Sequence, residues 1–330
     1  MIKMSTKGAV VQGLWREKQQ QRPKRPHFET ILTYVLLSSM SLLTASLNVL
    51  VIISVSHFKQ LHTPTSLLIL SLAVSDFFVG LLLVFQTTLT NGCWYIGDLM
   101  CALYQYLACI ITSTSIGNMV LISVDRYIAI CDPLHYSTKI TLKRVKICVC
   151  LCWTCSVFYQ SLILKDVLEQ PGRYNSCFGE CIIVINPIAG LAHIIISFTG
   201  PITVILILYM KVFVVAASQA RVMRSHTAAV TLQGSMKVSA RKSEMKAART
   251  LGVVVVVFII CLCPYYFVAL TGQDNLLSVA SATFVIFWTY INACLNPLIY
   301  AFFYPWFRKS VKLIVTLKIL LPNSSEAKML

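Results

Sequence analysis

The chain has 330 residues, of which 57% are hydrophobic and only 12% are charged, and its formal net charge is +16. No soluble domain of this length needs so much apolar surface, and several apolar runs reach membrane-spanning length. Because the basic residues lie between those runs, the charge indicates membrane topology and not a nucleic-acid groove, so we predict a polytopic helical membrane protein without a nucleic-acid partner.

The predicted membrane spans are seven apolar stretches that follow a polar, basic segment over residues 1–26. That first segment contains no apolar core of a signal peptide. A helix needs about 20 consecutive apolar residues to cross the hydrocarbon core of a bilayer. The stretches that meet this length are residues 31–56, 65–89, 101–124, 145–164, 187–214, 247–270 and 279–303.

The segment after the last span has a different pattern. Between Trp306 and Ile314, apolar residues alternate with Arg308, Lys309 and Lys312. This pattern is typical of a helix that lies on a membrane surface. The predicted fold is therefore an all-α membrane protein, a seven-transmembrane-helix bundle with a short amphipathic surface helix after the seventh span.

The orientation follows from the basic residues. The loops and tail on one side hold most of the lysines and arginines, whereas the loops on the other side hold only Lys165 and Arg173. The positive-inside rule then places the C-terminus in the cytoplasm and the N-terminus outside the cell. We expect an extracellular N-tail over residues 1–30, a membrane domain over residues 31–303, and a surface helix with a cytoplasmic tail over residues 304–330.

Ionisable groups occur at two depths in the predicted spans. Asp76 lies within the second span, and Asp125-Arg126-Tyr127 follows the third span at the cytoplasmic face. Such residues are expensive in a membrane and are by default functional-site hypotheses. The alternatives are that these polar groups, with Asn48 of the first span, only hold helices together, and that the triplet only anchors the interface.

Four of the thirteen cysteines, Cys93, Cys101, Cys177 and Cys181, fall on the predicted outer, oxidising side. Four cysteines allow three pairings. A bond between Cys101 and Cys181 would tie the outer loop across the top of the third span. A metal site is the other interpretation, but no histidine lies close to the Cys177–Cys181 spacing.

These features occur together in one known family. In chain order they are Asn48, Asp76 in LAVSD, Cys101, the DRY triplet 125–127, Trp153, Pro201, Pro264 and the NPLIY stretch 296–300. With them the chain resembles the rhodopsin-like (class A) G-protein-coupled receptors over about residues 28–321. The stretches 93–98 (CWYIGD), 129–139 and 300–309 are most similar to the trace amine-associated receptors of fish, which are chemosensory receptors.

The resemblance implies the function. We expect a plasma-membrane receptor, not an enzyme, that transmits the binding of a small extracellular ligand to a heterotrimeric G protein of the cAMP-raising stimulatory or olfactory class, without a cofactor. A sodium ion at Asp76 is the one metal it implies. A transporter would show internal repeats and broken helices, and neither is found. An enzyme would need an orienting acid beside His193 and Ser197, which is also missing.

The resemblance also assigns roles to residues. In the resting state Arg126 would pair with Asp125 and with Glu244 at the start of the sixth span, and activation would move that span outward. The implied activation switch comprises Asp125, Arg126, Tyr127, Tyr209, Glu244, Asn296, Pro297 and Tyr300. The implied sodium and water cluster comprises Asn48, Asp76, Ser115, Asn292 and Asn296. The implied packing relay comprises Ile116, Pro201 and Phe258.

The ligand pocket departs from the pattern. Related amine receptors carry a carboxylate eighteen residues before the DRY arginine, where this chain has Ala108. Many fish members place an aspartate eight residues before the fifth-span proline, where this chain has His193. The usual sixth-span tryptophan is Leu262, and Ala293 replaces a serine. A buried ammonium without an anion faces a desolvation cost of several kcal/mol.

The remaining pocket positions are rich in hydroxyls and aromatic faces. Tyrosines could hold a cation weakly, at about 0.5–2 kcal/mol each. His193 could bind a ligand group or could simply bond a neighbouring helix, and Glu180 of the outer loop would be a screened, poorer anchor. The full predicted pocket is Ala108, Cys109, Thr112, Ser113, His193, Ser197, Leu262, Tyr265, Tyr266 and Tyr290.

Two absences point to an alternative. The expected outer side has no Asn-x-Ser/Thr glycosylation sequence, and the N-tail lacks the cysteine that related receptors pair with the outer loop, so Cys177 is left for Cys93 or left free. An incorrectly assigned first exon would explain both, and so would a decaying gene. The alternative function is therefore an orphan or decayed receptor with non-amine specificity.

Overall fold

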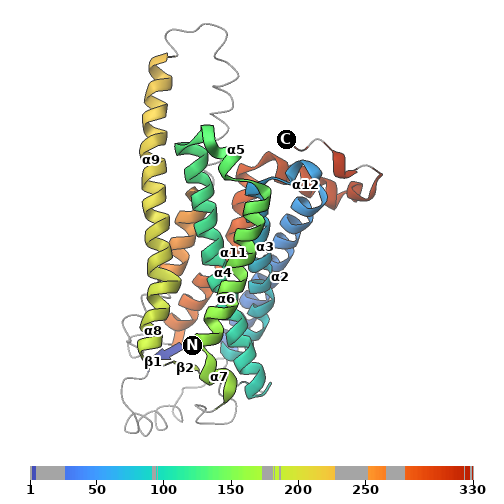
Figure 1. The fold of residues 1–330 in the computed structure, drawn as a ribbon. Helices are drawn as coiled ribbons and strands as arrows, with labels where there is room; N and C mark the ends of the chain where they lie inside the picture. Colours follow the sequence, from blue (N-terminus) through green and yellow to red (C-terminus); the bar gives the residue numbers. More distant parts are fainter. Residues whose placement is uncertain are drawn as a thin grey trace.

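The computed structural model is a bundle of long, roughly aligned helices (Figure 1). It describes residues 2–4, 27–90, 94, 96–172, 181, 183–185, 187–226, 252–264, 279–322, 324–327 and 329. Predictions that fall elsewhere, including the rest of the sixth span, lie outside the described residues.

The long helices follow the predicted spans. They are α2 (His27–His57), α3 (Pro64–Thr90), α4 (Asp98–Cys131), α6 (Leu142–Ile163), α8 (Pro187–Ile194) with α9 (Gly200–His226), and α11 (Val279–Phe303). Five of the described helical stretches are long and apolar enough to cross a membrane, and a shorter apolar helix covers Gly252–Pro264. The surface helix is present as α12 (Pro305–Val315).

The short elements are η1 (Lys59–Leu61), η2 (Pro133–His135), α5 (Tyr136–Lys139), α7 (Lys165–Glu169), η5 (Lys318–Leu320) and η6 (Ser324–Glu326). A strand pair joins β1 (Ile2–Met4) in parallel to β2 (Ile183–Ile185). The sequence indicated none of these strands and no helix at the start of the outer loop, because three- to five-residue elements have too few periods to leave a pattern.

Prolines begin several helices. Pro64 starts α3, and Thr63 before it accepts a hydrogen bond from the Ser66 backbone N–H at 3.2 Å. Pro305 starts α12 and Pro187 starts α8. Proline suits the first turn because its missing N–H would have no partner there anyway.

Pro201 has a different effect because it lies inside the fifth span. A proline there cannot donate to the carbonyl four residues earlier, and its ring clashes with that carbonyl. The five residues before Gly200, Ile195–Thr199 (η3), form a π-helical segment between α8 and α9. Such a bulge absorbs the mismatch and rotates the preceding turn, which carries His193.

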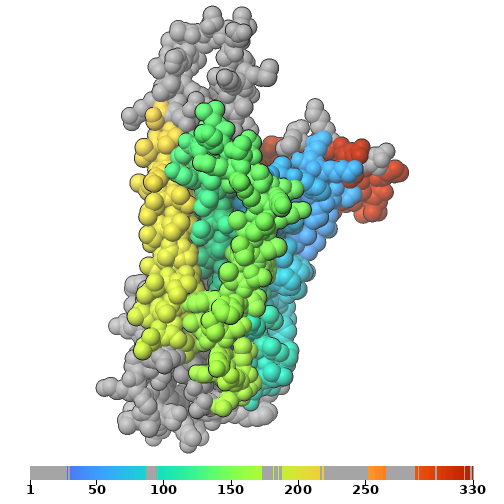
Figure 2. Space-filling view, viewed as in Figure 1, coloured from blue at the N-terminus to red at the C-terminus, as the bar shows by residue number. Residues whose placement is uncertain are grey.

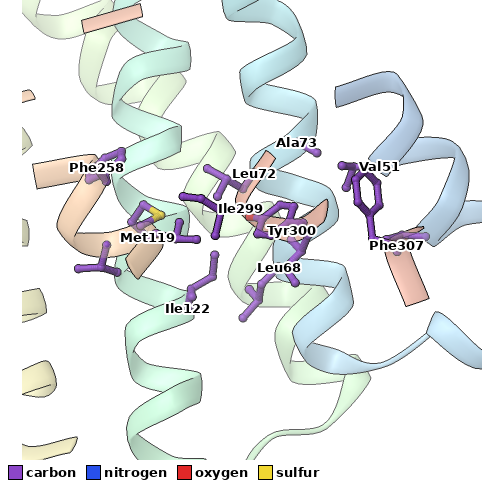
Figure 3. Close-up of a cluster of buried hydrophobic side chains, with 14 of the residues drawn as sticks. Val51, Leu68, Leu72, Ala73, Met119, Ile122, Phe258, Ile299, Tyr300 and Phe307 are labelled. Carbon is purple, nitrogen blue, oxygen red and sulfur yellow. The ribbon is translucent and has the colours of Figure 1, made fainter. Parts of the chain in front are cut away.

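The main core runs from the middle of the bundle to the end that carries α12. Buried side chains from α2, α3, α4, α9, α11, α12 and the sixth-span helix form one cluster. Figure 3 shows Tyr300 packed beside Leu68 and Leu72 of α3, with Met119 of α4 close to Phe258. The sixth-span helix, which the resemblance implies would move on activation, therefore packs directly on α4.

The outer surface is also apolar. Figure 2 shows α6 and α9 on one face of the bundle. These two helices expose large hydrophobic side chains, among them Phe158, Met210 and Phe213. A soluble protein rarely exposes so much apolar surface, whereas lipid covers it at no cost.

The C-terminal segment forms more structure than the tail expected from the sequence. Leu317 has a left-handed φ of 57° directly after α12, and the chain turns there towards η1. Glu326 pairs with Lys59 at 3.0 Å, and the Met329 backbone N–H donates to Gln60 Oε1 at 2.8 Å. Thus the tail packs on the end of α2, at the end of the bundle opposite β1 (Figure 1).

Candidate functional site

The end of the bundle that carries β2 is tied by a disulfide. Cys101 near the start of α4 is bonded to Cys181, with 5.6 Å between the Cα atoms, so the predicted pair is present. Cys93 and Cys177 lie outside the described residues, and their pairing stays a prediction. Among the described residues, no three or more potential His, Cys, Asp or Glu ligands gather as a metal site would require.

Ala108 is one of the predicted pocket residues on α4. It is partly buried and packs against a cluster that contains Leu82, Trp94 and Tyr104. The Thr112 hydroxyl donates to the Ala108 carbonyl at 2.8 Å and is thus engaged by its own helix. The position that holds a carboxylate in related amine receptors is therefore an apolar contact here.

A neutral hydrogen-bonded chain lies one turn from Ala108. The Tyr104 hydroxyl donates to Gln86 Oε1 at 2.7 Å, and it lies 3.4 Å from the hydroxyl of Tyr290. These groups connect α4 to α3 and α11. Tyr290 was predicted from the sequence, but Gln86 and Tyr104 were missed, although Tyr104 precedes Ala108 by one helical turn and so shares its face.

His193 lies on α8 and is buried against α6. Its Nδ1 lies 3.3 Å from the Ser197 hydroxyl, and its ring stacks on Tyr159 at a centroid distance of 5.9 Å. The Tyr159 hydroxyl is buried close to Ser197 and, among the described residues, makes no hydrogen bond of ordinary geometry. The polar partner of His193 is thus Ser197 of the same span, and its neighbour on α6 is the aromatic ring of Tyr159.

Ser113 contributes to helix packing. Gln160 of α6 is fully buried and donates from Nε2 to the Ser113 hydroxyl at 2.5 Å and to the Cys109 carbonyl at 3.5 Å. Leu262 is buried in the central apolar cluster. Tyr265 and Tyr266 lie outside the described residues. Among the predicted pocket residues that the structure describes, His193 and Ser197 therefore form one neutral polar pair in the fifth span. Tyr290 of α11 forms a second neutral pair with Tyr104 of α4.

The predicted packing relay lies below these groups. Ile116 and Phe258 are each 1% exposed and belong to the central cluster. Pro201 lies in the first turn of α9, directly after the π-helical segment. The contact between α4 and the sixth-span helix is thus made of tightly packed apolar side chains, which can repack between discrete arrangements and cannot deform continuously.

Asp76 lies at mid-depth and is 1% exposed. Asn296 donates from Nδ2 to Asp76 Oδ2 at 2.8 Å, and Ser115 donates to the neighbouring Ser75 hydroxyl at 2.9 Å. The side-chain oxygens of Asn292 and Asn296 are buried without a partner among the described residues. Hard cations and water prefer such oxygens, so the residues present fit a hydrated sodium ion.

Asn48 has a second use. Pro297 lies inside α11 and has no N–H for the carbonyl of Ala293, four residues earlier. Asn48 donates its Nδ2 to that carbonyl at 3.0 Å and to the Thr44 carbonyl at 2.9 Å. The amide of α2 therefore satisfies the group that the proline leaves free, and its own oxygen remains without a partner among the described residues.

The charged pair of the DRY triplet is buried at the α12 end. Arg126 Nε lies 3.0 Å from Asp125 Oδ2, and the Thr65 hydroxyl donates to the same oxygen at 2.9 Å. Tyr136 of α5 donates to Asp125 Oδ1 at 2.8 Å, and burial raises the pKa of Tyr136, which keeps this donor protonated. The carboxylate thus has three partners, as a buried charge requires.

The tyrosines assigned to the switch lie nearby. The hydroxyls of Tyr209 and Tyr300 are buried without a hydrogen-bond partner among the described residues, as is the hydroxyl of Tyr304, which was not assigned to the switch. Tyr127 is instead half-buried against Ile130 and Val212, and Lys211 Nζ lies 5.9 Å from its ring centroid. Glu244 lies outside the described residues, so its pairing with Arg126 stays a prediction.

The sequence of this bundle matches known receptors over nearly its whole length. Residues 47–300 match the family described as 7 transmembrane receptor (rhodopsin family). The chain is 36% identical to mouse trace amine-associated receptor 1, over 90% of this chain and 92% of the relative. It is 38% identical to zebrafish trace amine-associated receptor 13c, over 89% and 88%, respectively. The chain belongs to the rhodopsin family of seven-transmembrane receptors and, within it, to the trace amine-associated receptors.

Proposed function

We propose that this receptor is a chemosensor that binds a small extracellular molecule and activates a stimulatory, cAMP-raising G protein. Membership of the family provides the classes of partner, a ligand and a G protein. The proposal places the α12 end in the cytoplasm, because Arg308, Lys309 and Lys312 of α12 and the basic residues around α5 lie there. The disulfide end then faces the ligand.

The proposed ligand is not a simple primary amine. The observation that carries this proposal is that both positions where related amine receptors hold a carboxylate are neutral, Ala108 in an apolar contact and His193 in a bond with Ser197. Asp76 and Asp125 already have hydrogen-bond partners deeper in the bundle. An ammonium at pocket level would therefore lose its hydration without gaining an anion from the described residues.

The neutral groups instead suit a ligand with hydrogen-bonding ends. His193 with Ser197 presents an imidazole and a hydroxyl at one end, and Tyr104 with Tyr290 presents two hydroxyls at the other. Polar groups that converge in a mostly apolar site are typical of small-molecule recognition. A protonated His193 would also attract an acid.

The proposed switch is the pair Asp125–Arg126. In the resting state the guanidinium is held by Asp125 and by the Thr65 hydroxyl, which lies 2.6 Å from Nη2. Outward movement of the sixth-span helix would open the space around Tyr209 and Tyr300 and release Arg126 towards the G protein. A sodium ion beside Asp76 would bias this equilibrium towards the closed state.

A concentration–response experiment tests the ligand proposal. Amines, carboxylic acids and neutral odorants are applied to cells that express the wild type, with cAMP as the readout and surface expression matched. We expect poor responses to amines. His193→Asp should increase amine potency by about a hundredfold, because an ion pair of about 3 kcal/mol is restored. Ala108→Asp is the second choice, since it also adds volume.

The neutral controls are His193→Asn and Ala108→Asn, which match the aspartates in size but carry no charge. A wild-type response to amines at low micromolar concentration would contradict the proposal and point to Glu180 or another acid. The second candidate, a receptor that has lost its agonist, is favoured by the same missing carboxylates. A wild type that reaches the surface but answers no compound, while His193→Asp answers amines, would support it.

A further inference from the structure

Three prolines interrupt membrane-spanning helices, and the structure treats each in a different way. A proline inside a helix frees the carbonyl four residues earlier. Pro201 is preceded by the π-helical segment, and the carbonyl freed by Pro297 accepts from Asn48. Pro264 of the sixth-span helix frees the carbonyl of Ile260. That carbonyl also has a partner, and the partner lies on α11.

The partner is Trp288. Its indole Nε1–H donates to the Ile260 carbonyl at 3.1 Å. Indole nitrogen can only donate a hydrogen bond, and a freed carbonyl can only accept one, so the two groups are chemically matched. The bond joins α11 to the sixth-span helix one turn before Pro264.

The surroundings make this bond important. Ile260 is 53% exposed and lies on the face of the bundle that lipid would cover. In hydrocarbon, neither group can replace its partner with water, and an unsatisfied backbone carbonyl is costly there. Separation of the two helices at this point would leave the Ile260 carbonyl unpaired, unless another donor reaches it.

We propose that Trp288 is a positioning residue that holds the sixth-span helix in its resting place through the carbonyl freed by Pro264. The inference rests on the proposed function, because it assumes that activation moves this helix away from α11 and α4. Here Leu262 occupies the position of the family's sixth-span tryptophan and is buried in the apolar cluster. Trp288 supplies an indole contact to the same turn of the helix, but from the neighbouring helix α11.

The test is a double-mutant cycle between Trp288→Phe and Pro264→Ala. Phenylalanine keeps an aromatic ring but removes the N–H, and alanine at 264 restores a backbone N–H for the Ile260 carbonyl. Trp288→Phe should raise ligand-independent cAMP by about fivefold, the effect of losing one typical hydrogen bond. In the Pro264→Ala background it should add nothing.

The matched control is Tyr106→Phe. It removes another interhelical hydrogen bond, 2.8 Å from Tyr106 to Ser161, at a place without a proline. This variant should keep wild-type basal cAMP. A wild-type basal level in Trp288→Phe, or the same increase in both backgrounds, would overturn the proposal.

A second readout does not depend on signalling. Backbone hydrogen exchange over residues 252–264 is measured on the purified receptor in nanodiscs. Trp288→Phe should accelerate exchange near Ile260 by about fivefold, whereas Tyr106→Phe should not. Unchanged exchange would overturn the role of Trp288. If exchange accelerates but no variant produces cAMP with any compound, the proposed coupling fails while the positioning role stands.

Discussion

The two halves of the bundle stabilise their buried polar groups by different chemistry. Towards α12, the carboxylates Asp76 and Asp125 are each 1% exposed and are matched by amide, hydroxyl or guanidinium donors. Towards the disulfide, the described pocket positions carry only neutral groups, such as His193 and Tyr290. The half that would signal has kept its charges, and the half that would select a ligand has not.

This difference separates two functions that one fold supports. Removal of one partner of a buried ion pair leaves the other charge buried and unpaired, at a large cost in stability. Neither Asp125 nor Arg126 can therefore be replaced alone without that cost. A pocket carboxylate has no such partner in the ligand-free protein, and its burial is a cost to folding. A neutral residue at these positions, such as Ala108 or His193, avoids that cost, and under the proposed function it also changes which ligands can bind.

The largest expected effect comes from breaking the charged half. Arg126→Glu places two carboxylates side by side and leaves Thr65 without a cation to bond. We expect no ligand-dependent or basal cAMP at normal surface expression, since the group released towards the G protein is gone. Arg126→Lys, which keeps the charge, is the control and should retain part of the response. Wild-type signalling from Arg126→Glu would remove Arg126 from the switch.

The next largest effect concerns the other half. Cys181→Ala leaves the segment before β2 untied from α4 and leaves Cys101 unpaired on the outer side. Loss of a disulfide typically costs about 2–5 kcal/mol, a large part of the stability of most domains. We expect little receptor at the cell surface, measured by antibody labelling of a terminal tag. Cys109→Ala, which removes a free cysteine of the same helix, should traffic normally.

Much of the fold follows from the sequence because span length and charge placement are local signals. The surface helix was predicted from such a pattern, whereas the disulfide Cys101–Cys181 was predicted from the outer cysteines and the family from its motif residues; all three are confirmed. The tail contacts were not foreseen, because the ion pair between Lys59 and Glu326 joins segments far apart in the chain. Such a pair leaves no periodic pattern.

The candidate site was predictable only in part. Positions such as Ala108 and His193 could be read from their distance to motif residues, but their partners could not. In the sequence, two residues look like ordinary members of apolar helices. They are Gln160, which donates to the Ser113 hydroxyl, and Trp288, which donates to the Ile260 carbonyl. Their roles depend on which face of one helix meets another, and packing alone decides that.

A smaller effect tests how the charged half is held closed. Glu244→Ala should raise ligand-independent cAMP, because Arg126 loses a partner expected only in the resting state. Asp125 and Thr65 still hold the guanidinium, so we expect about fivefold, as for the loss of an ion pair of about 1 kcal/mol. Glu244→Asp is the control. An unchanged basal level at matched surface expression would count against the pair.

The smallest expected effect concerns the loop after α4, which holds Tyr136 in hydrogen-bond contact with Asp125. Asp132 lies 2.7 Å from His135 Nδ1 and 2.8 Å from Lys139 Nζ, and these hydrogen bonds, that to Lys139 foremost, lower the pKa of Asp132. A lowered pKa means that the contribution to stability is complete above the ordinary pKa of an aspartate and disappears only as the pH falls through the lowered value.

The loop should therefore be equally ordered at pH 7 and pH 8.5. At both pH values, Asp132→Asn should accelerate amide exchange over residues 133–140 by about twofold, the modest size expected of an exposed ion pair. Rates are corrected for the intrinsic effect of pH, and Lys143→Gln, a basic residue of α6 outside this pair, is the control. An equal acceleration in Lys143→Gln would show that net charge, and not the bonds of Asp132, orders the loop. The charged half would then end at Asp125.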